Sequence, residues 1–232
     1  MALTPTRPTH LPAYAELCLS ALAEHQFGDK ISLGDAFALL HYLDYRSTYD
    51  VDAWWATLTT PDERQQVIET LTAALQNFGQ TCVRTWGAVV SVELDTEKRK
   101  VFSFQIAERS VQLYRSIAAP WVDVLLDSLP DLLASKMIAL VERGAPRDFR
   151  DIYAVCQAAL TTINECWRLW QNRLQAAGSE VDLERARLAI ETHLERIEQN
   201  RPLDQISNPE QRVQAQIVRQ WYREQFLYAK LD

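Results

Sequence analysis

The chain has 232 residues, of which 47% are hydrophobic and 24% are charged, with nine prolines and six glycines. This composition is that of a globular protein with one large domain or two small ones, and it excludes disordered, collagen-like and coiled-coil chains. A formal net charge of -7 disfavours non-specific nucleic-acid binding, which requires neutralisation of phosphates, but leaves a local basic groove open.

Membrane-spanning and zinc-binding or disulfide-rich proteins are also disfavoured. No stretch approaches the roughly 20 consecutive apolar residues that cross a bilayer, and the first residues lack the charged-then-apolar order of a secretion signal. The four cysteines are widely separated and form no C-x-x-C pair, so we expect reduced, mostly buried thiols. These features predict a cytoplasmic protein.

The first predicted elements are two helices and a strand. Apolar spacing predicts a helix over residues 14–25 that ends before Gly28. A second, short helix is expected over residues 36–43, with Asp35 as its N-cap. The β-branched and aromatic residues of segment 46–55 predict a strand.

A further helix and a β-hairpin follow in the chain. Proline at the first position and acids in the first turn predict a helix over residues 61–75. Segments 82–94 and 100–106 alternate between apolar and polar residues on either side of a charged stretch, which predicts a hairpin. Residues 111–114 are expected to add a strand.

The second half of the chain has helical periodicity. Breaks at glycine and proline divide it into predicted helices over residues 132–143, 149–175, 182–199 and 209–229. The order predicts an α+β fold, with a small mixed sheet followed by a C-terminal helical bundle. We place the domains at residues 1–118 and 119–232 and expect the helical part to complete an active-site cleft, since such sites often lie where two parts meet.

Two aspartates lie two positions apart in the strand predicted over residues 46–55. Because side chains alternate along a strand, Asp50 and Asp52 would share one face, with Cα atoms roughly 7 Å apart, and Val51 would face a core. Two neighbouring carboxylates repel, so a compensating cation is required, and Mg²⁺ held with nucleotide phosphates is the natural candidate. Two aspartates that simply face water would have the same spacing.

A possible phosphate-binding turn precedes this strand. Gly34 and Asp35 stand at the start of the short helix, which is the order expected when a turn that binds phosphates leads into a metal-binding strand. Arg46 could bind a phosphate oxygen bidentately, or it could form a surface ion pair with Asp44 or Asp50.

The predicted helices around residue 140 contain unusual charges. Lys136 interrupts an otherwise apolar helix. We expect its aliphatic stem to pack against the apolar neighbours and its ammonium to face a specific partner such as a triphosphate. The alternative is a lysine whose ammonium merely reaches solvent. In the next helix Arg147 and Asp151 can pair, and Asp148 and Asp151 share a face. A capped helix start with an internal salt bridge explains this second helix equally well.

These segments resemble a known family. Leu133-Ala-Ser-Lys-Met-Ile-Ala-Leu with Arg147-Asp-Phe-Arg-Asp-Ile-Tyr is similar to the C-terminal motif of the AbiEii/AbiGii toxin family of nucleotidyltransferases. Tyr45-Arg-Ser-Thr-Tyr-Asp-Val-Asp resembles the metal-binding strand of that family. The resemblance spans about residues 33–155 and leaves out the terminal helices.

The resemblance implies a polymerase-β-like nucleotidyltransferase that uses Mg²⁺ and an NTP to modify an acceptor hydroxyl, in some members on tRNA, and that has a cognate antitoxin. By position, Asp50 and Asp52 would hold the metal, Lys136 would contact the phosphates and Asp148 would complete the site, for instance as the base for the attacking hydroxyl. The resemblance also implies that four further residues assist nucleotide binding: Gly34, Asp35, Arg46 and Arg147.

Two departures from the family pattern motivate a second hypothesis. Asp35 replaces the usual hydroxyl residue after glycine, which places negative charge beside the triphosphate. The strand that often supplies a third carboxylate offers Ser103 and Gln105 instead, with Glu93 as a possible substitute. A catalytically silent binding module with the same fold is therefore the alternative.

Overall fold

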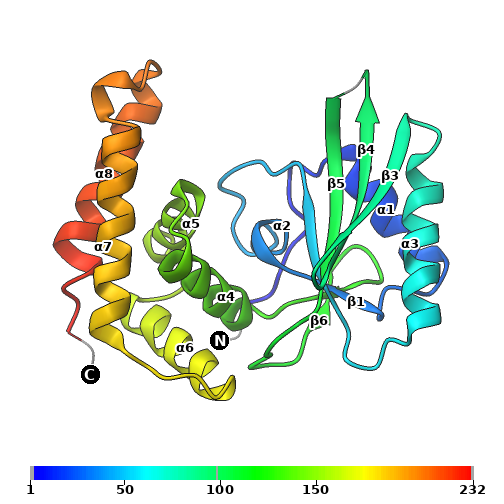
Figure 1. The fold of residues 1–232 in the computed structure, drawn as a ribbon, viewed down its shortest axis with the longest axis horizontal. Coiled ribbons are helices and arrows are strands. Elements are labelled where there is room, and N and C mark those ends of the chain that lie inside the picture. Colours follow the sequence, from blue (N-terminus) through cyan, green and yellow to red (C-terminus); the bar gives the residue numbers. More distant parts are fainter. Residues whose placement is uncertain (1–2, 98, 231–232) are drawn as a thin grey trace. The chain divides into compact units, whose positions relative to one another are not determined.

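The computed structural model describes residues 3–97 and 99–230 and consists of two compact units, Met1–Leu132 and Leu133–Asp232 (Figure 1). The first unit holds the β-sheet, and the second is helical. The predicted α+β class, with a small mixed sheet followed by helices, is confirmed. The first unit extends past residue 118 because β7 (Leu125–Leu126) pairs with β1 (Ile31–Leu33).

The sheet of the first unit is mixed, with the strand order β3-β4-β5-β2-β1-β7-β6. Its other strands are β2 (Val51–Trp55), β3 (Gln80–Trp86), β4 (Val89–Thr96), β5 (Arg99–Ala107) and β6 (Ile117–Ala118). Strand β2 runs parallel to β5, and β1 runs parallel to β7, while the other neighbouring strands are antiparallel. The two parallel pairings bring together segments that lie far apart in the sequence.

Three helices belong wholly to this unit: α1 (Ala13–Glu24), α2 (Asp35–Leu39) and α3 (Pro61–Leu75). Helix α3 has the predicted bounds because Thr60 caps it. The Thr60 hydroxyl accepts from the Glu63 amide at 3.3 Å, and the Glu63 carboxylate accepts from the Thr60 amide at 2.7 Å. This reciprocal capping satisfies two amides that the first turn of a helix leaves unpaired.

Helices α1 and α3 lie together against one face of the sheet (Figure 1). The ring centroid of Tyr14 on α1 lies 5.9 Å from that of Phe102 on β5. Phe102, Phe104 and Ile106 alternate along β5, so they point to the face of the sheet that α1 covers. All three side chains are buried. Since side chains alternate along a strand, Ser103 and Gln105 point to the opposite face, where the candidate site lies.

Several strand predictions are wrong for identifiable reasons. The strand expected from residue 46 begins at Val51, because pairing with β5 starts there. Segment 82–94 contains most of two antiparallel strands, β3 and β4, which are joined by a turn at Gly87, where φ is +54°. Strand β1 was not predicted, since its three residues are too few to show alternation.

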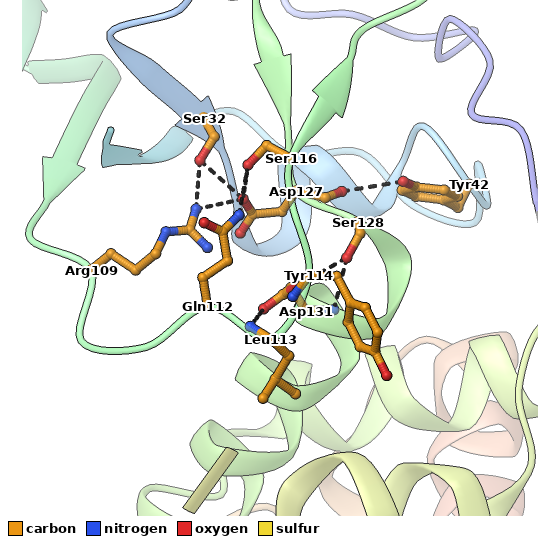
Figure 2. Close-up of polar contacts among 10 residues, drawn as sticks. All are labelled: Ser32, Tyr42, Arg109, Gln112, Leu113, Tyr114, Ser116, Asp127, Ser128 and Asp131. Carbon is orange, nitrogen blue, oxygen red and sulfur yellow. Dashed lines mark hydrogen bonds and ion pairs between the residues drawn. The ribbon is translucent and has the colours of Figure 1, made fainter. Parts of the chain in front are cut away.

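Residues 111–114 form no strand, although a strand was expected there. The amides of Leu113 and Tyr114 donate instead to the two carboxylate oxygens of Asp131, at 2.7 and 2.8 Å (Figure 2). Side-chain acceptors therefore take the amides that a neighbouring strand would have used.

The second unit is built from helices. They are α4 (Leu129–Glu142), which begins in the first unit, α5 (Pro146–Gln157), α6 (Ile163–Ala176), α7 (Leu183–Asn200), η1 (Leu203–Gln205), α8 (Pro209–Trp221) and the π-helix η2 (Tyr222–Phe226). The single helix expected over residues 149–175 is wrong, because the chain breaks after α5 at Ala159, where φ is +55°.

Aromatic side chains form the core of this unit. Phe149 on α5 lies 4.7 Å from Tyr222, and Trp167 on α6 lies 5.3 Å from Phe226, measured between ring centroids. Trp221, Tyr222 and Phe226 are all buried, whereas Tyr228 is exposed. Within the described ranges, no helix combines the length and the apolar character needed to span a membrane.

His41, just after α2, provides a pH-dependent contribution to stability. Its Nδ1 is 3.2 Å from the Phe37 carbonyl oxygen, and its Nε2 accepts from the Trp121 indole at 3.1 Å. Burial lowers the pKa of His41 from 6.5 to about 4. The unfolded chain therefore binds this proton at a higher pH than the native chain does, and stability falls as the pH falls through that range.

We expect the free energy of unfolding to drop by up to about 3 kcal/mol between pH 6.5 and pH 4 through this histidine. Denaturant unfolding at a series of pH values measures the slope, and His41→Gln should flatten it. A matched control, His10→Gln at an exposed histidine, should keep the slope. Equal slopes for the His41 variant and the unsubstituted chain would show that His41 is not the titrating group.

Candidate active site

The turn between β1 and α2 is held against β2. The Gly34 amide donates to the Asp52 carbonyl oxygen at 2.8 Å, and a Cβ atom at Gly34 would lie 2.3 Å from the indole nitrogen of Trp54. Only glycine leaves room for Trp54 here. The prediction that Asp35 caps α2 is wrong, because Gly34 occupies the cap position and Asp35 is the first helical residue, with φ +46°.

Asp50 and Asp52 lie at the start of β2. Asp50 directly precedes the strand and Asp52 is its second residue, and both are half-buried, whereas Val51 between them is completely buried. The Asp50 Oδ1 atom accepts a hydrogen bond from the Ser103 hydroxyl at 2.7 Å. In the parallel register of β2 and β5, Asp52 pairs with Gln105, which follows Ser103 on the same face.

Glu93 lies on β4, opposite Ser103. Its carboxylate is 3.0 Å from the Arg84 guanidinium and 3.9 Å from the Lys100 ammonium. This acid is thus engaged by two cations rather than grouped with the aspartates. In the part of the chain that the structure describes, no three Asp, Glu, His or Cys side chains gather as a metal-binding group.

A hollow of about 650 Å³ opens beside Asp50. Its wall includes two acidic, two basic and two aromatic residues, but not Asp52. The lining residues are Tyr49, Asp50, Thr96, Glu97, Arg99, Lys100, Val101 and Phe102. The Tyr49 side chain is 72% exposed. A molecule of nucleotide size therefore has space next to this carboxylate.

Arg46 lies in the loop before β2. Its guanidinium stacks 5.7 Å from the centroid of the Tyr45 ring, and its Nη1 donates to the Ser47 carbonyl oxygen at 3.3 Å. These contacts hold the side chain near the surface, where it is half-buried. Arg46 therefore lies beside residues 47–49, which lead into Asp50.

The remaining predicted site residues belong to the second unit. Lys136 on α4 is 1% exposed, and its Nζ lies 2.7 Å from the Asp151 carboxylate on α5. Asp148 is completely buried and accepts from Arg143 at 2.8 and 2.9 Å and from the Ala145 amide at 3.1 Å. Arg147, next to it, is exposed. The structure thus brings Lys136 together with Asp151, and Arg143 together with Asp148.

These contacts bear on the base role expected for Asp148. Both oxygens of the Asp148 carboxylate already accept hydrogen bonds, Oδ1 from Arg143 and Oδ2 from Arg143 and the Ala145 amide. Asp148 also caps the start of α5 through the Ala145 amide. A base at this position therefore requires that the Arg143 pair opens.

A second polar cluster was not predicted from the sequence. The buried Asp127 accepts from Ser32 on β1, from Arg109 and from Ser116, and burial raises the pKa of its carboxyl above the usual value (Figure 2). The Arg109 guanidinium also lies 5.7 Å from the Trp54 ring centroid. The cluster thus fixes the loop after β5 beside the candidate site.

The neighbouring pair Ser128 and Asp131 carries a recognisable sequence signal. Ser128 donates to the Asp131 carboxylate at 3.0 Å, and Ser-x-x-Asp before an apolar run is the pattern of a capping box at the start of a helix. Arg109 stands in an irregular segment and carries no such signal. Its partner Asp127 lies between β7 and α4, far from Arg109 along the chain, so only the fold brings the two side chains together.

Comparison with known proteins gives a family and a fold. A family model for the nucleotidyl transferase AbiEii toxin of type IV toxin–antitoxin systems matches residues 80–226. The solved structure of a candidate nucleotidyltransferase from H. pylori is similar over 91% of this chain and 94% of its own, with a TM-score of 0.51 and 16% identity. No curated protein matches the chain.

The extent of the family match differs from the expected span of residues 33–155. It begins after β2 and continues through η2, so it includes the terminal helices that were expected to lie outside. Lys136, Asp148 and Ser103 lie inside the match, whereas Asp50 and Asp52 precede it. The similarity to the solved structure shows the nucleotidyltransferase fold alone.

Proposed function

Because the chain belongs to the AbiEii nucleotidyltransferase toxin family, we propose that it transfers a nucleotidyl group from an NTP to an acceptor hydroxyl with the help of Mg²⁺. The observation that carries the proposal is the pair Asp50 and Asp52 at the start of β2, of which Asp50 lines a hollow of about 650 Å³. As a toxin of this family, the protein is proposed to act with a cognate antitoxin, and tRNA is the acceptor tested first.

The donor set fits a magnesium ion. Mg²⁺ usually binds through one or two carboxylates, with substrate phosphates and water completing an octahedron. Asp50 and Asp52 would hold it, and the absence of a third grouped acid among the described residues is compatible with that mode. When bound, the ion supplies charge neutralisation and orientation at the transferring phosphoryl group.

The chain's own cations would assist with the triphosphate. In the proposal, Lys136 and Arg147 contact phosphates and Asp148 completes the site. Arg46 and the Gly34–Asp35 turn assist nucleotide binding. The Lys136 ammonium also forms an ion pair with the Asp151 carboxylate, which is 2.7 Å away. These assignments rest on the resemblance.

The test is a labelling experiment. The purified protein is incubated with each α-³²P-labelled NTP in turn, Mg²⁺ and total tRNA, and a gel shows which macromolecule carries label. One NTP is expected to label an acceptor, and chelation of the metal should abolish the label. Absence of label with every NTP, in tRNA and in a cell extract, would contradict the proposal.

A silent binding module remains the second candidate, and Ser103 at the position expected for a third acid is the observation that favours it. Calorimetric titration with each NTP separates the two functions. Metal-dependent heat together with transfer supports the enzyme. NTP binding without transfer supports the module.

A further inference from the structure

Ser103 lies on β5 with its side chain completely buried against Asp50. Its Oγ donates to Asp50 Oδ1 at 2.7 Å, and the Gln105 amide nitrogen donates to the same Oγ at 3.4 Å. A serine hydroxyl has one hydrogen and accepts through its lone pairs. The bond from Gln105 therefore leaves the hydroxyl hydrogen directed at Asp50.

This arrangement constrains the aspartate at the start of β2. A bond from a buried donor selects one rotamer of Asp50. An ionised carboxylate has two oxygens, so Oδ1 can accept from Ser103 while Oδ2 binds a cation. Carboxylates that ligate metals are commonly held by such an outer hydrogen bond.

The geometry points to Ser103 as a positioning residue that holds Asp50 ready for a divalent cation, with Gln105 orienting the serine hydroxyl. This inference rests on the proposed function. The serine stands where a third carboxylate was expected, and it supports one of the two ligands instead of adding another. The site then works with two carboxylates.

The test measures metal binding directly, without nucleotidyl transfer. The full chain is titrated with Mn²⁺, and the signal of the free ion is followed by electron paramagnetic resonance. Asp50→Asn defines the binding that does not involve the site. We expect Ser103→Ala to weaken the site-specific binding by about tenfold, within the range for outer hydrogen-bond partners of metal ligands.

Two further variants separate positioning from a general effect on the core. Ser103→Thr keeps the hydroxyl and should bind Mn²⁺ close to the unsubstituted level. Ser91→Ala removes another completely buried hydroxyl, one strand away on β4, where it is 3.5 Å from Glu93. This variant should bind Mn²⁺ normally. Circular dichroism of each variant checks that the sheet is intact.

The outcomes distinguish this inference from the proposed function. If Asp50→Asn binds Mn²⁺ as well as the unsubstituted chain does, the metal site itself is wrong. The proposed function and the inference about Ser103 are then both overturned. If Asp50→Asn loses binding while Ser103→Ala retains it, only the inference is overturned. Equal losses in Ser103→Ala and Ser91→Ala, or a Thr variant as weak as the Ala variant, would also overturn it.

Discussion

Replacement of Asp50 by asparagine is expected to lower the rate of nucleotidyl transfer by at least about 100-fold, the scale on which loss of one charge-stabilising group acts in an active site. Asparagine has nearly the same shape and keeps an oxygen that can accept from Ser103, which is 2.7 Å from Asp50 in the structure. The change therefore removes the negative charge while preserving the local packing. The rate is measured with the NTP that labels an acceptor.

A matched control for this variant is Asp62→Asn. Asp62 is exposed in the first turn of α3 and does not line the hollow, so the same chemical change there should leave the transfer rate unaltered. Thermal unfolding of both variants shows whether the fold persists. A folded Asp50→Asn protein with the transfer rate of the unsubstituted chain would contradict the role given to this carboxylate.

Lys136→Met is expected to lower the free energy of unfolding by about 3–5 kcal/mol, because it leaves the buried Asp151 without its cationic partner. The Lys136 ammonium is 2.7 Å from that carboxylate, and both side chains are almost wholly buried. Methionine retains most of the stem, so the effect arises from the lost charge and not from a cavity. Denaturant unfolding measures the difference.

Lys230→Met is the matched control, since this lysine is exposed in the same unit and its loss should change stability by less than about 0.5 kcal/mol. The double variant Lys136→Met/Asp151→Leu should recover much of the lost stability, because it removes both charges. A stability of Lys136→Met equal to that of the control would refute the buried pair. Loss of transfer in a Lys136 variant therefore indicates a phosphate contact only if its stability is measured as well.

Local signals predicted the elements whose boundaries are set by nearby residues. Helix α3 begins at Pro61 because Thr60 and Glu63 cap it, and these residues stand within one turn of each other. The hairpin of β4 and β5 was visible as alternation on both sides of a charged turn. The split between α5 and α6 was not visible, because Ala159 adopts φ +55° without glycine to mark it.

Much less of the candidate site could be predicted, because it depends on pairing between distant segments. Asp50 and Asp52 were recognisable from their spacing, but the bond from Ser103 requires β5 to lie beside β2 in one register. Lys136 was expected to face a triphosphate, and its neighbour Asp151 was expected to pair with Arg147. The helix pattern could not show that α4 packs Lys136 onto Asp151 instead.

In the proposed function, Asp50 and Asp52 jointly hold the ion that carries a nucleoside triphosphate. The most direct measurement is a crystal structure of the chain with Mn²⁺ and a non-hydrolysable NTP, in which anomalous scattering locates the ion. We predict one peak at about 2.1 Å from a carboxylate oxygen of each aspartate, the distance expected in an octahedral oxygen site. A bound nucleotide whose Mn²⁺ contacts neither aspartate would contradict the account.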